Sequence, residues 1–301
     1  LTLAVFALVW FITLGTVQGF ANPLGLALLA GAALSLVLFV RAERRSAHPM
    51  FDFSVFRIHR FNGAMMGSIG MNFSFWPFMI YLPIYFQAGL GHDVMHTGWA
   101  LLAYTLPTLL VPPLAERLAL RHGAECVIPG GLGLMAAPFG LMALGDARGS
   151  DALVIAACLA AGIGLGLTNS PVTNTSTGSV AAARAGMASG IDFSARLITL
   201  AFNIALMGFV LVSGIARHLG EAGLASAPGE LLQLAQGVAA GKLDALPGAA
   251  GPALAQAALR EGFGDVMRYA GIGVGLLALA SHVFFRRTNA SACTVQQACA
   301  K

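Results

Sequence analysis

Residues 186–215 read GMASGIDFSARLITLAFNIALMGFVLVSGI, a stretch long and apolar enough to cross a lipid bilayer as a helix. It nevertheless carries Asp192 and Arg196, one helical turn apart, and Thr199 and Asn203 continue the same helical face. At about 1.5 Å per residue, Arg196 lies roughly 14 Å into such a helix, near the middle of a hydrocarbon core about 30 Å thick. A charge at that depth costs about 2.5–3.5 kcal/mol on insertion scales, so we expect this face to meet protein or water rather than lipid.

Two interpretations of this polar face are open. In the first, it forms the wall of a substrate or proton pathway, with Asp192 and Arg196 as its charged groups. Asn72 and Trp76 are further candidates for pathway-facing side chains, and Asn169, like Thr199, is expected to supply hydrogen bonds. In the second, the acid and the base pair only with each other, as residues one turn apart readily do, and fix helix packing.

The composition indicates a membrane protein that crosses the bilayer several times. Of its 301 residues, 57% are hydrophobic and only 10% are charged, and the mean hydropathy is +0.78, whereas a soluble domain carries roughly 25% charged residues. The 37 glycines suit the close approach of transmembrane helices. The formal net charge of +4 does not point to nucleic acid, because no basic run is interleaved with aromatic side chains.

Eight apolar stretches are expected to be transmembrane helices, which makes the fold all-α. These stretches are residues 1–17, 24–40, 61–87, 98–114, 126–144, 152–168, 186–215 and 266–285. Pro107, Pro112 and Pro113 predict that the fourth stretch is broken or kinked. The many Met and aromatic residues of the third suit a promiscuous apolar pocket, and equally an ordinary core or lipid-facing surface.

The segments between these stretches differ in character. Residues 41–60 form a basic linker, residues 115–125 are expected to be a loop, and a Ser/Thr-rich connection follows residue 168. The long loop 216–265 contains two short helical patterns, residues 230–240 and 252–261, which are expected to be interfacial or loosely ordered.

Charge predicts the topology. Arginines are concentrated in residues 41–60, 117–121 and 286–287, and the positive-inside rule makes these segments cytoplasmic. Both ends of the chain, including the tail 287–301, are then cytoplasmic, and the loop 216–265 lies on the opposite side. Because the chain opens on Leu1 with an apolar run, we interpret residue 1 as a cut within a longer protein.

Catalytic and metal-binding signatures are not apparent, so we expect no enzyme, no metal and no soluble cofactor. The four cysteines lack the spacing of a zinc site or a disulfide framework. His92 and His96 stand one turn apart beside Asp93, and we expect an ordinary exposed loop there rather than a metal site.

Five stretches in the same order resemble the 14-span drug:proton antiporter class of the major facilitator superfamily. They are HPMFDFSVFRIHRFNGA (48–64), YLPIYFQAGLGHDVMHTGWALLAYTLP (81–107), PPLAERLALRHGAE (112–125), GIGLGLTNSPVTN (162–174) and RAGMASGIDFSARLITLAFNIAL (184–206). Arg196 falls on an arginine that is typical of the class. In the third stretch Arg117, Arg121 and Gly123 match a conformational-switch loop, but Leu120 stands where an acid is usual and Glu125 where a base is usual.

The resemblance implies an architecture. Residues 1–40 would be two inserted linker helices, and residues 61–286 the C-terminal six-helix transport bundle. The N-terminal six-helix bundle, which usually carries proton-coupling acids in this class, would be missing, so this chain should not transport alone.

The resemblance also implies a function: proton-coupled export of amphipathic or lipophilic small organic molecules by alternating access. Protons, the substrate and the lipid bilayer are then the partners. The composition, biased to Ala, Gly, Leu and Arg, points to the inner membrane of a Gram-negative bacterium. A non-transporting membrane scaffold or sensor derived from the same fold is the alternative, and an intramembrane enzyme is a weaker one.

Overall fold

A computed structural model describes residues 2–18, 22–45, 51–148, 150–223, 228–246 and 251–299. Gly19, the linker residue His48 and the final Lys301 lie outside them. Within these ranges the secondary structure is helical, without a strand. The longer helices are α1 (Thr2–Gln18), α2 (Pro23–Arg45), α3 (His59–Phe73), α4 (Phe75–Ile84), α5 (Val94–Leu110), α6 (Pro112–His122), α7 (Ala124–Arg148), α8 (Asp151–Gly178), α9 (Ala185–Glu221), α10 (Pro228–Ala239) and α11 (Gly251–Cys299).

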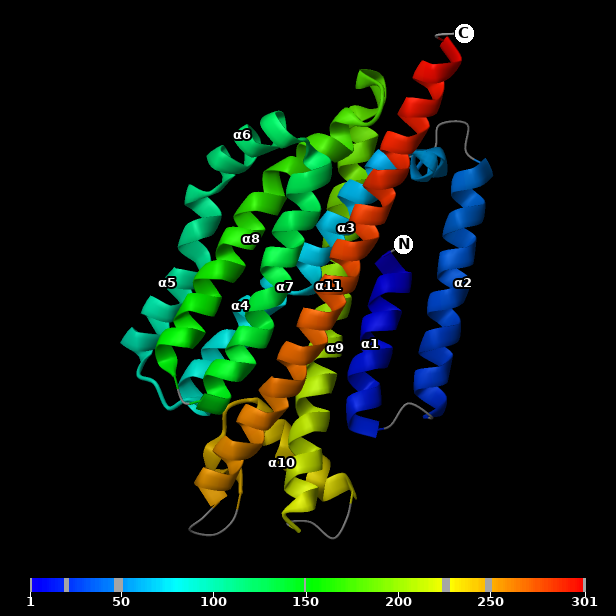
Figure 1. Cartoon of the computed structure of the whole chain (residues 1–301). Helices are drawn as coiled ribbons and strands as arrows, with labels where there is room; N and C mark the ends of the chain where they lie inside the picture. The colour runs from blue at the N-terminus through cyan, green and yellow to red at the C-terminus, as the bar shows by residue number, and fades with distance from the viewer. Residues whose placement is uncertain are drawn as a thin grey trace.

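Short helical turns lie between some of the longer helices. A 3-10 turn at Phe53–Arg57 precedes α3, a π-helical turn at Tyr85–Gly89 follows α4, and 3-10 turns at Ala182–Arg184 and Leu243–Ala245 precede α9 and α11. In Figure 1, α3, α7, α8, α9 and α11 run side by side, α5 and α6 flank α8, and the hairpin of α1 and α2 stands at one side against α9. The hairpin thus packs on the outside of the bundle, where α1 contacts α9.

Length and hydropathy identify five described helices as able to cross a membrane. They are Pro23–Arg45, Ala124–Met142, Asp151–Gly178, Ala182–Glu221 and Gly251–Arg287. A sixth crossing results if α5 and α6, which meet at 47°, are counted as one span. The expected number of eight stays a prediction, since the first expected span forms only a shorter apolar helix and the third is divided in two.

The third expected span is broken at Ser74, between α3 and α4. The cause lies three residues further on, because Pro77 has no N–H to bond the carbonyl of Phe73, its partner four residues earlier in a continuous helix. Ser74 leaves helical geometry, with φ −126° and ψ −67°. Side chains compensate: Asn203 of α9 donates to the Phe73 carbonyl, and the Ser74 hydroxyl donates to the Gly70 carbonyl at 3.2 Å.

The proline-rich fourth span is bent, as predicted. Pro112 occupies the first position of α6, where its missing N–H costs nothing, and the chain turns by 47° there. The prediction of a loop at residues 115–125 was wrong, since α6 continues to His122. The helix ends at Gly123, whose φ of +84° is readily available only to glycine.

Two other predicted boundaries were wrong for a common reason, which is that buried faces continue past the apolar stretch. The Ser/Thr-rich connection after residue 168 is helical to Gly178, with Thr168, Thr175 and Ser176 buried. The hydroxyl of Thr168 bonds the Gly164 carbonyl at 2.7 Å, so hydroxyl groups enter the core already satisfied.

The predicted short helix 252–261 likewise is not separate, because it forms the start of α11. Leu259, Phe263 and Val266 are fully buried and make one continuous apolar face across the expected boundary. The other short helix expected in the long loop, residues 230–240, is present as α10.

Glycines allow α8 to approach two helices closely, as the sequence predicts. A Cβ on Gly162 would lie 2.3 Å from the Tyr104 carbonyl oxygen of α5. A Cβ on Gly164 would lie 2.8 Å from the backbone nitrogen of Met135 in α7. Neither position can take a side chain without separating the helices.

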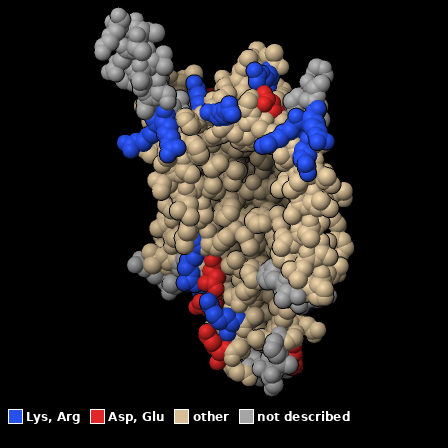
Figure 2. Space-filling model, turned by 90° about the vertical axis from the view of Figure 1, so that its right-hand side faces the viewer, with Lys and Arg blue, Asp and Glu red and all other residues tan. Residues whose placement is uncertain are grey.

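Charged side chains are segregated along the molecule. On the face shown in Figure 2, basic side chains gather at the upper end, and acidic and basic side chains mix at the lower end. A broad zone without charged side chains separates these ends, and it is hollowed in the middle. An uncharged zone between two charged ends is the surface pattern of a protein that sits across a bilayer.

Candidate functional site

Asp192 and Arg196, the two charged residues of the stretch 186–215, form an ion pair inside the protein. In α9, Arg196 Nε donates to Asp192 Oδ2 at 3.1 Å, and its Nη2 lies 3.0 Å from the same oxygen. The Asp192 side chain is 6% exposed and that of Arg196 17% exposed. Both side chains therefore point into the protein, and the i, i+4 pairing allowed by the sequence is made.

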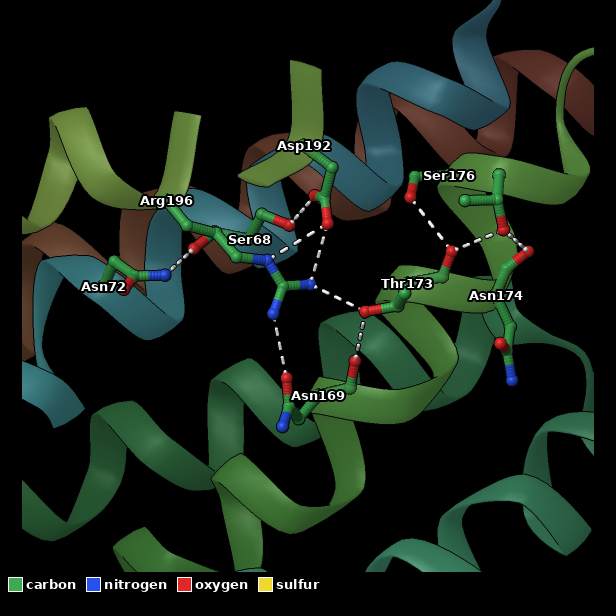
Figure 3. Close-up of polar contacts among 9 residues, drawn as sticks. Ser68, Asn72, Asn169, Thr173, Asn174, Ser176, Asp192 and Arg196 are labelled. Atoms are coloured by element: carbon green, nitrogen blue, oxygen red, sulfur yellow. Dashed lines mark hydrogen bonds and ion pairs between the residues drawn. The ribbon is translucent and has the colours of Figure 1, made fainter. Parts of the chain in front are cut away.

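The pair is not self-contained, because Arg196 also reaches α8. Its Nη1 donates to Asn169 Oδ1 at 2.9 Å, and its Nη2 donates to Thr173 Oγ1 at 2.9 Å. The planar guanidinium thus holds an acid on its own helix and two neutral acceptors on another (Figure 3). A lysine ammonium, a point charge on a flexible stem, could not hold this geometry.

A third helix completes the network from the other side. The Ser68 hydroxyl of α3 donates to Asp192 Oδ1, the carboxylate oxygen that Arg196 leaves open. One turn further along α3, Asn72 is buried, and its Nδ2 donates to the Ser68 carbonyl at 3.0 Å. Side chains of α3, α8 and α9 therefore converge on one acid–base pair, as Figure 3 shows.

A polar pocket of about 520 Å³ adjoins this network. It is lined by Glu116, Asn169, Ser170, Thr173 and Asn174. Two of these, Asn169 and Thr173, are the residues that hold the guanidinium. Across the pocket, Asn174 Nδ2 donates to Glu116 Oε1 at 2.9 Å, which joins α8 to α6. The pocket thus places a carboxylate and several hydrogen-bonding groups beside the charged network.

Asn203, a predicted pathway residue, has a different set of contacts. It is fully buried, donates to the Phe73 carbonyl at the break between α3 and α4, and accepts a 2.6 Å hydrogen bond from the Tyr269 hydroxyl of α11. Both ends of its amide are engaged in holding three helices together.

Two other predicted residues do not join the network. Thr199 is half-buried on α9, and it is not among the described residues that hydrogen-bond to Asp192 or Arg196. Trp76 is 44% exposed on α4, and its ring meets Phe75 edge-on at 5.8 Å. The structure therefore gathers Asn72, Asn169, Asp192 and Arg196 from the predicted set.

The predicted switch loop lies at the end of α6. Arg117 and Arg121 are exposed, and Gly123 ends the helix with its positive φ. A Cβ on Gly123 would lie 2.6 Å from the Glu125 carboxyl carbon. The tight-turn geometry expected of this glycine is present, while the role of the loop stays a prediction.

Sequence reasoning missed three residues of the site, namely Ser68, Thr173 and Glu116. Ser68 and Thr173 look like ordinary small polar residues of their helices, and only the packing of α3 and α8 on α9 brings them to the ion pair. A signal was available for Thr173, since it lies four residues after Asn169 and so shares its helical face.

A family model and several related proteins match this chain. The family model described as Major Facilitator Superfamily matches residues 1–204. Multidrug resistance protein Stp of Mycobacterium tuberculosis is 31% identical over 72% of this chain and 40% of its own length. Quinolone resistance protein NorB of Staphylococcus aureus is 28% identical over 66% of this chain and 43% of its own length. An uncharacterised Escherichia coli transporter, YebQ, is 30% identical over 68% of this chain and 46% of its own length. The chain therefore matches less than half the length of each of these relatives.

Proposed function

Because this chain belongs to the Major Facilitator Superfamily, a family of transporters rather than enzymes, we propose that it is part of a proton-coupled exporter. The proposed substrates are amphipathic or lipophilic small organic molecules, and the proposed mode of action is alternating access, in which two bundles rock about a site near the middle of the membrane. The printed names of two relatives, multidrug resistance protein Stp and quinolone resistance protein NorB, support this class of function.

The main support for this proposal is the environment of Asp192. Among the described residues it is the one acidic residue in the buried core. An ionisable side chain at such a position costs free energy, so it is retained where it serves a pathway or fixes the structure. Its two oxygens are held by different groups, Ser68 on one side and Arg196 on the other.

This division of partners suggests how a proton or substrate could act on the pair. Arg196 is shared between Asp192 in α9 and two acceptors in α8, so a small shift of α8 relative to α9 would change the balance between them. When the guanidinium moves toward Asn169 and Thr173, the carboxylate loses its counter-ion and can take up a proton. When the proton leaves, the ion pair re-forms.

The polar pocket is the proposed binding site for the substrate. Its wall includes the same two acceptors, Asn169 and Thr173, and its far side carries Glu116. A substrate that hydrogen-bonds to these acceptors would compete with Arg196 for them, which couples substrate binding to the ion pair. In the complete protein this bundle would work against a second one.

The test is efflux of a panel of lipophilic dyes by the full-length protein in cells, with and without collapse of the proton gradient. Asp192→Asn and Arg196→Ala are expected to abolish gradient-dependent efflux at normal expression. The matched control is Arg217→Ala, on the same helix, whose guanidinium pairs with the partly exposed Asp265 at 2.8 Å. Unchanged efflux of every dye by both site variants would reject the mechanistic role.

The second candidate function, a non-transporting scaffold or sensor, rests on the alternative interpretation of the same ion pair, in which it only fixes the packing of α3, α8 and α9. It predicts that the full-length wild-type protein is expressed and folded but moves no dye in either direction. In that case the site variants would lower stability without any change in efflux.

A further inference from the structure

Away from the ion pair, three ligating side chains meet where α5 and α8 begin. His92 precedes α5, His96 lies in its first turn, and Asp151 is the first residue of α8. Each offers one ligand atom, and these atoms all lie within 4.8 Å of one another. The sequence pairs the two histidines with Asp93, but the structure brings Asp151 to them, from more than fifty positions further along the chain.

Asp93 does not belong to this cluster and has a structural role instead. Its carboxylate caps α5, where it accepts a 2.9 Å hydrogen bond from the His96 backbone N–H. This cap fixes the first turn of α5 and so holds His96 near His92. The two imidazole rings have their centroids 4.4 Å apart, with an angle of 49° between their planes.

The distances fit a small tetrahedral cation. His92 Nε2 lies 3.3 Å from Asp151 Oδ2. For metal–ligand bonds of about 2.0–2.1 Å, the ligand atoms of a tetrahedral site lie about 3.3–3.4 Å apart. One edge of the tetrahedron is therefore already formed, and His96, whose side chain is at the surface, can complete the face by rotating about its side-chain bonds.

The surroundings of His92 provide a second observation. Its side chain is 14% exposed, its ring stacks on Phe86 at 6.0 Å, and its backbone N–H bonds the Phe86 carbonyl at 2.9 Å, so the residue is held in place. Its Nδ1 is buried and has no hydrogen-bond partner among the described residues. Because Nδ1 is enclosed by the protein, the cation would bind Nε2, the ring nitrogen that faces Asp151.

We propose that His92, His96 and Asp151 form a binding site for one Zn²⁺ ion. Two imidazoles and a carboxylate are the donors that Zn²⁺ accepts, and three protein ligands leave a fourth position for water. His96 and Asp151 are exposed, which gives the ion a path from solvent. The bound ion ties the start of α5 to the start of α8, and so braces the end of the bundle that is remote from α6.

The test uses the full chain in detergent, purified without a histidine tag, stripped with a chelator and titrated with Zn²⁺ in a calorimeter. Binding of one ion per chain is expected, together with a rise in the thermal unfolding midpoint. His96→Ala and Asp151→Asn should each raise the dissociation constant at least about tenfold, the loss that even removal of an outer-shell partner typically causes. The control is His122→Ala, an exposed histidine at the end of α6, which should leave binding unchanged.

A second reporter distinguishes this site from binding elsewhere. Co²⁺ in place of Zn²⁺ should give the visible absorption bands of a tetrahedral complex in the wild-type protein, and lose them in His96→Ala. This variant removes an exposed side chain, so the protein should still fold. Absence of stoichiometric binding, or binding of equal strength in His96→Ala and wild type, would overturn the proposal. Neither measurement depends on transport, so the outcome is separate from that of the proposed function.

Discussion

The side-chain amide of Asn203 donates a hydrogen bond to the carbonyl of Phe73, the backbone oxygen that Pro77 leaves without its helical partner. Inside a membrane-spanning bundle no water is at hand to satisfy such an oxygen, so a neighbouring helix supplies the donor. The break between α3 and α4 and the polar residue in the middle of α9 are therefore two parts of one feature. Tyr269 completes it by donating to the other end of the amide.

Removal of this amide should destabilise the protein. Asn203→Ala leaves the Phe73 carbonyl and the Tyr269 hydroxyl without their partner, and each buried unsatisfied group costs about 1–3 kcal/mol. We expect a clear fall in the thermal unfolding midpoint of the purified protein. Asn174→Ala, which removes an exposed amide that bonds Glu116, serves as the control and should have little effect. Equal midpoints for the two variants would contradict the assignment.

The guanidinium geometry of Arg196 predicts that lysine cannot replace it. Arg196→Lys keeps the charge beside Asp192 but loses the planar fork that also bonds Asn169 and Thr173. Hydrogen bonds to charged groups are worth about 1.5–3 kcal/mol each, so chemical denaturation should show a loss of that order. Arg217→Lys on the same helix alters an exposed ion pair and should cost at most about 1 kcal/mol. A loss no greater than in this control would show that the fork carries no stability.

The contact of α7 with α8 predicts opposite effects for two glycines. Gly164→Ala places a methyl group 2.8 Å from the Met135 backbone nitrogen and 2.9 Å from the Gly131 carbonyl oxygen, neither of which can move aside cheaply. We expect a destabilisation of about 1–3 kcal/mol, typical of overpacking. Gly133→Ala in α7 meets nothing within 4 Å and should stabilise by up to about 1 kcal/mol through helix propensity. Thermal unfolding of both variants checks the difference in sign.

The hydrogen bonds of Asp52, in the linker before α3, predict that the stability of the protein depends on pH. The Ser54 hydroxyl and backbone N–H, which donate to Asp52 at 2.7 and 2.9 Å, hold the pKa of this carboxyl below its ordinary value of 3.8, and Arg184 at 3.0 Å adds to the effect. A carboxyl whose pKa is lower in the folded state contributes stability above its unfolded pKa, and this contribution is lost as the pH falls through the folded value.

The measurement is the difference in thermal midpoint between wild type and Asp52→Asn as a function of pH. The difference should be constant above roughly pH 5 and shrink as the pH drops below the ordinary pKa. A difference that grows in acid would contradict the sign of the shift. Arg184→Ala should reduce the difference without removing it, because the two Ser54 hydrogen bonds remain.

Much of the helical framework could be predicted from local chemistry. The apolar stretches, the bend at the proline-rich segment and the tight turn at Gly123 follow from hydropathy and from the backbone preferences of proline and glycine. Boundaries were predicted less well, because α8 and α11 continue into polar sequence wherever one side of the helix is still buried. Whether a residue is buried depends on its neighbours in space, and hydropathy along the chain does not contain that information.

The amino-acid sequence alone indicated a helical membrane protein, because its composition is that of a membrane protein and its apolar stretches are much longer than the about 9–11 residues of a membrane-spanning strand. It also determined that Asp192 and Arg196 share a helical face, since a spacing of four residues fixes that. The packing of the helices, in contrast, brings Ser68, Asn169 and Thr173 to the pair. It also places Asn203 against the carbonyl that Pro77 leaves free, and Asp151 beside His92 and His96. These relationships join residues of different helices, and they depend on how the helices pack, which no spacing along the chain encodes.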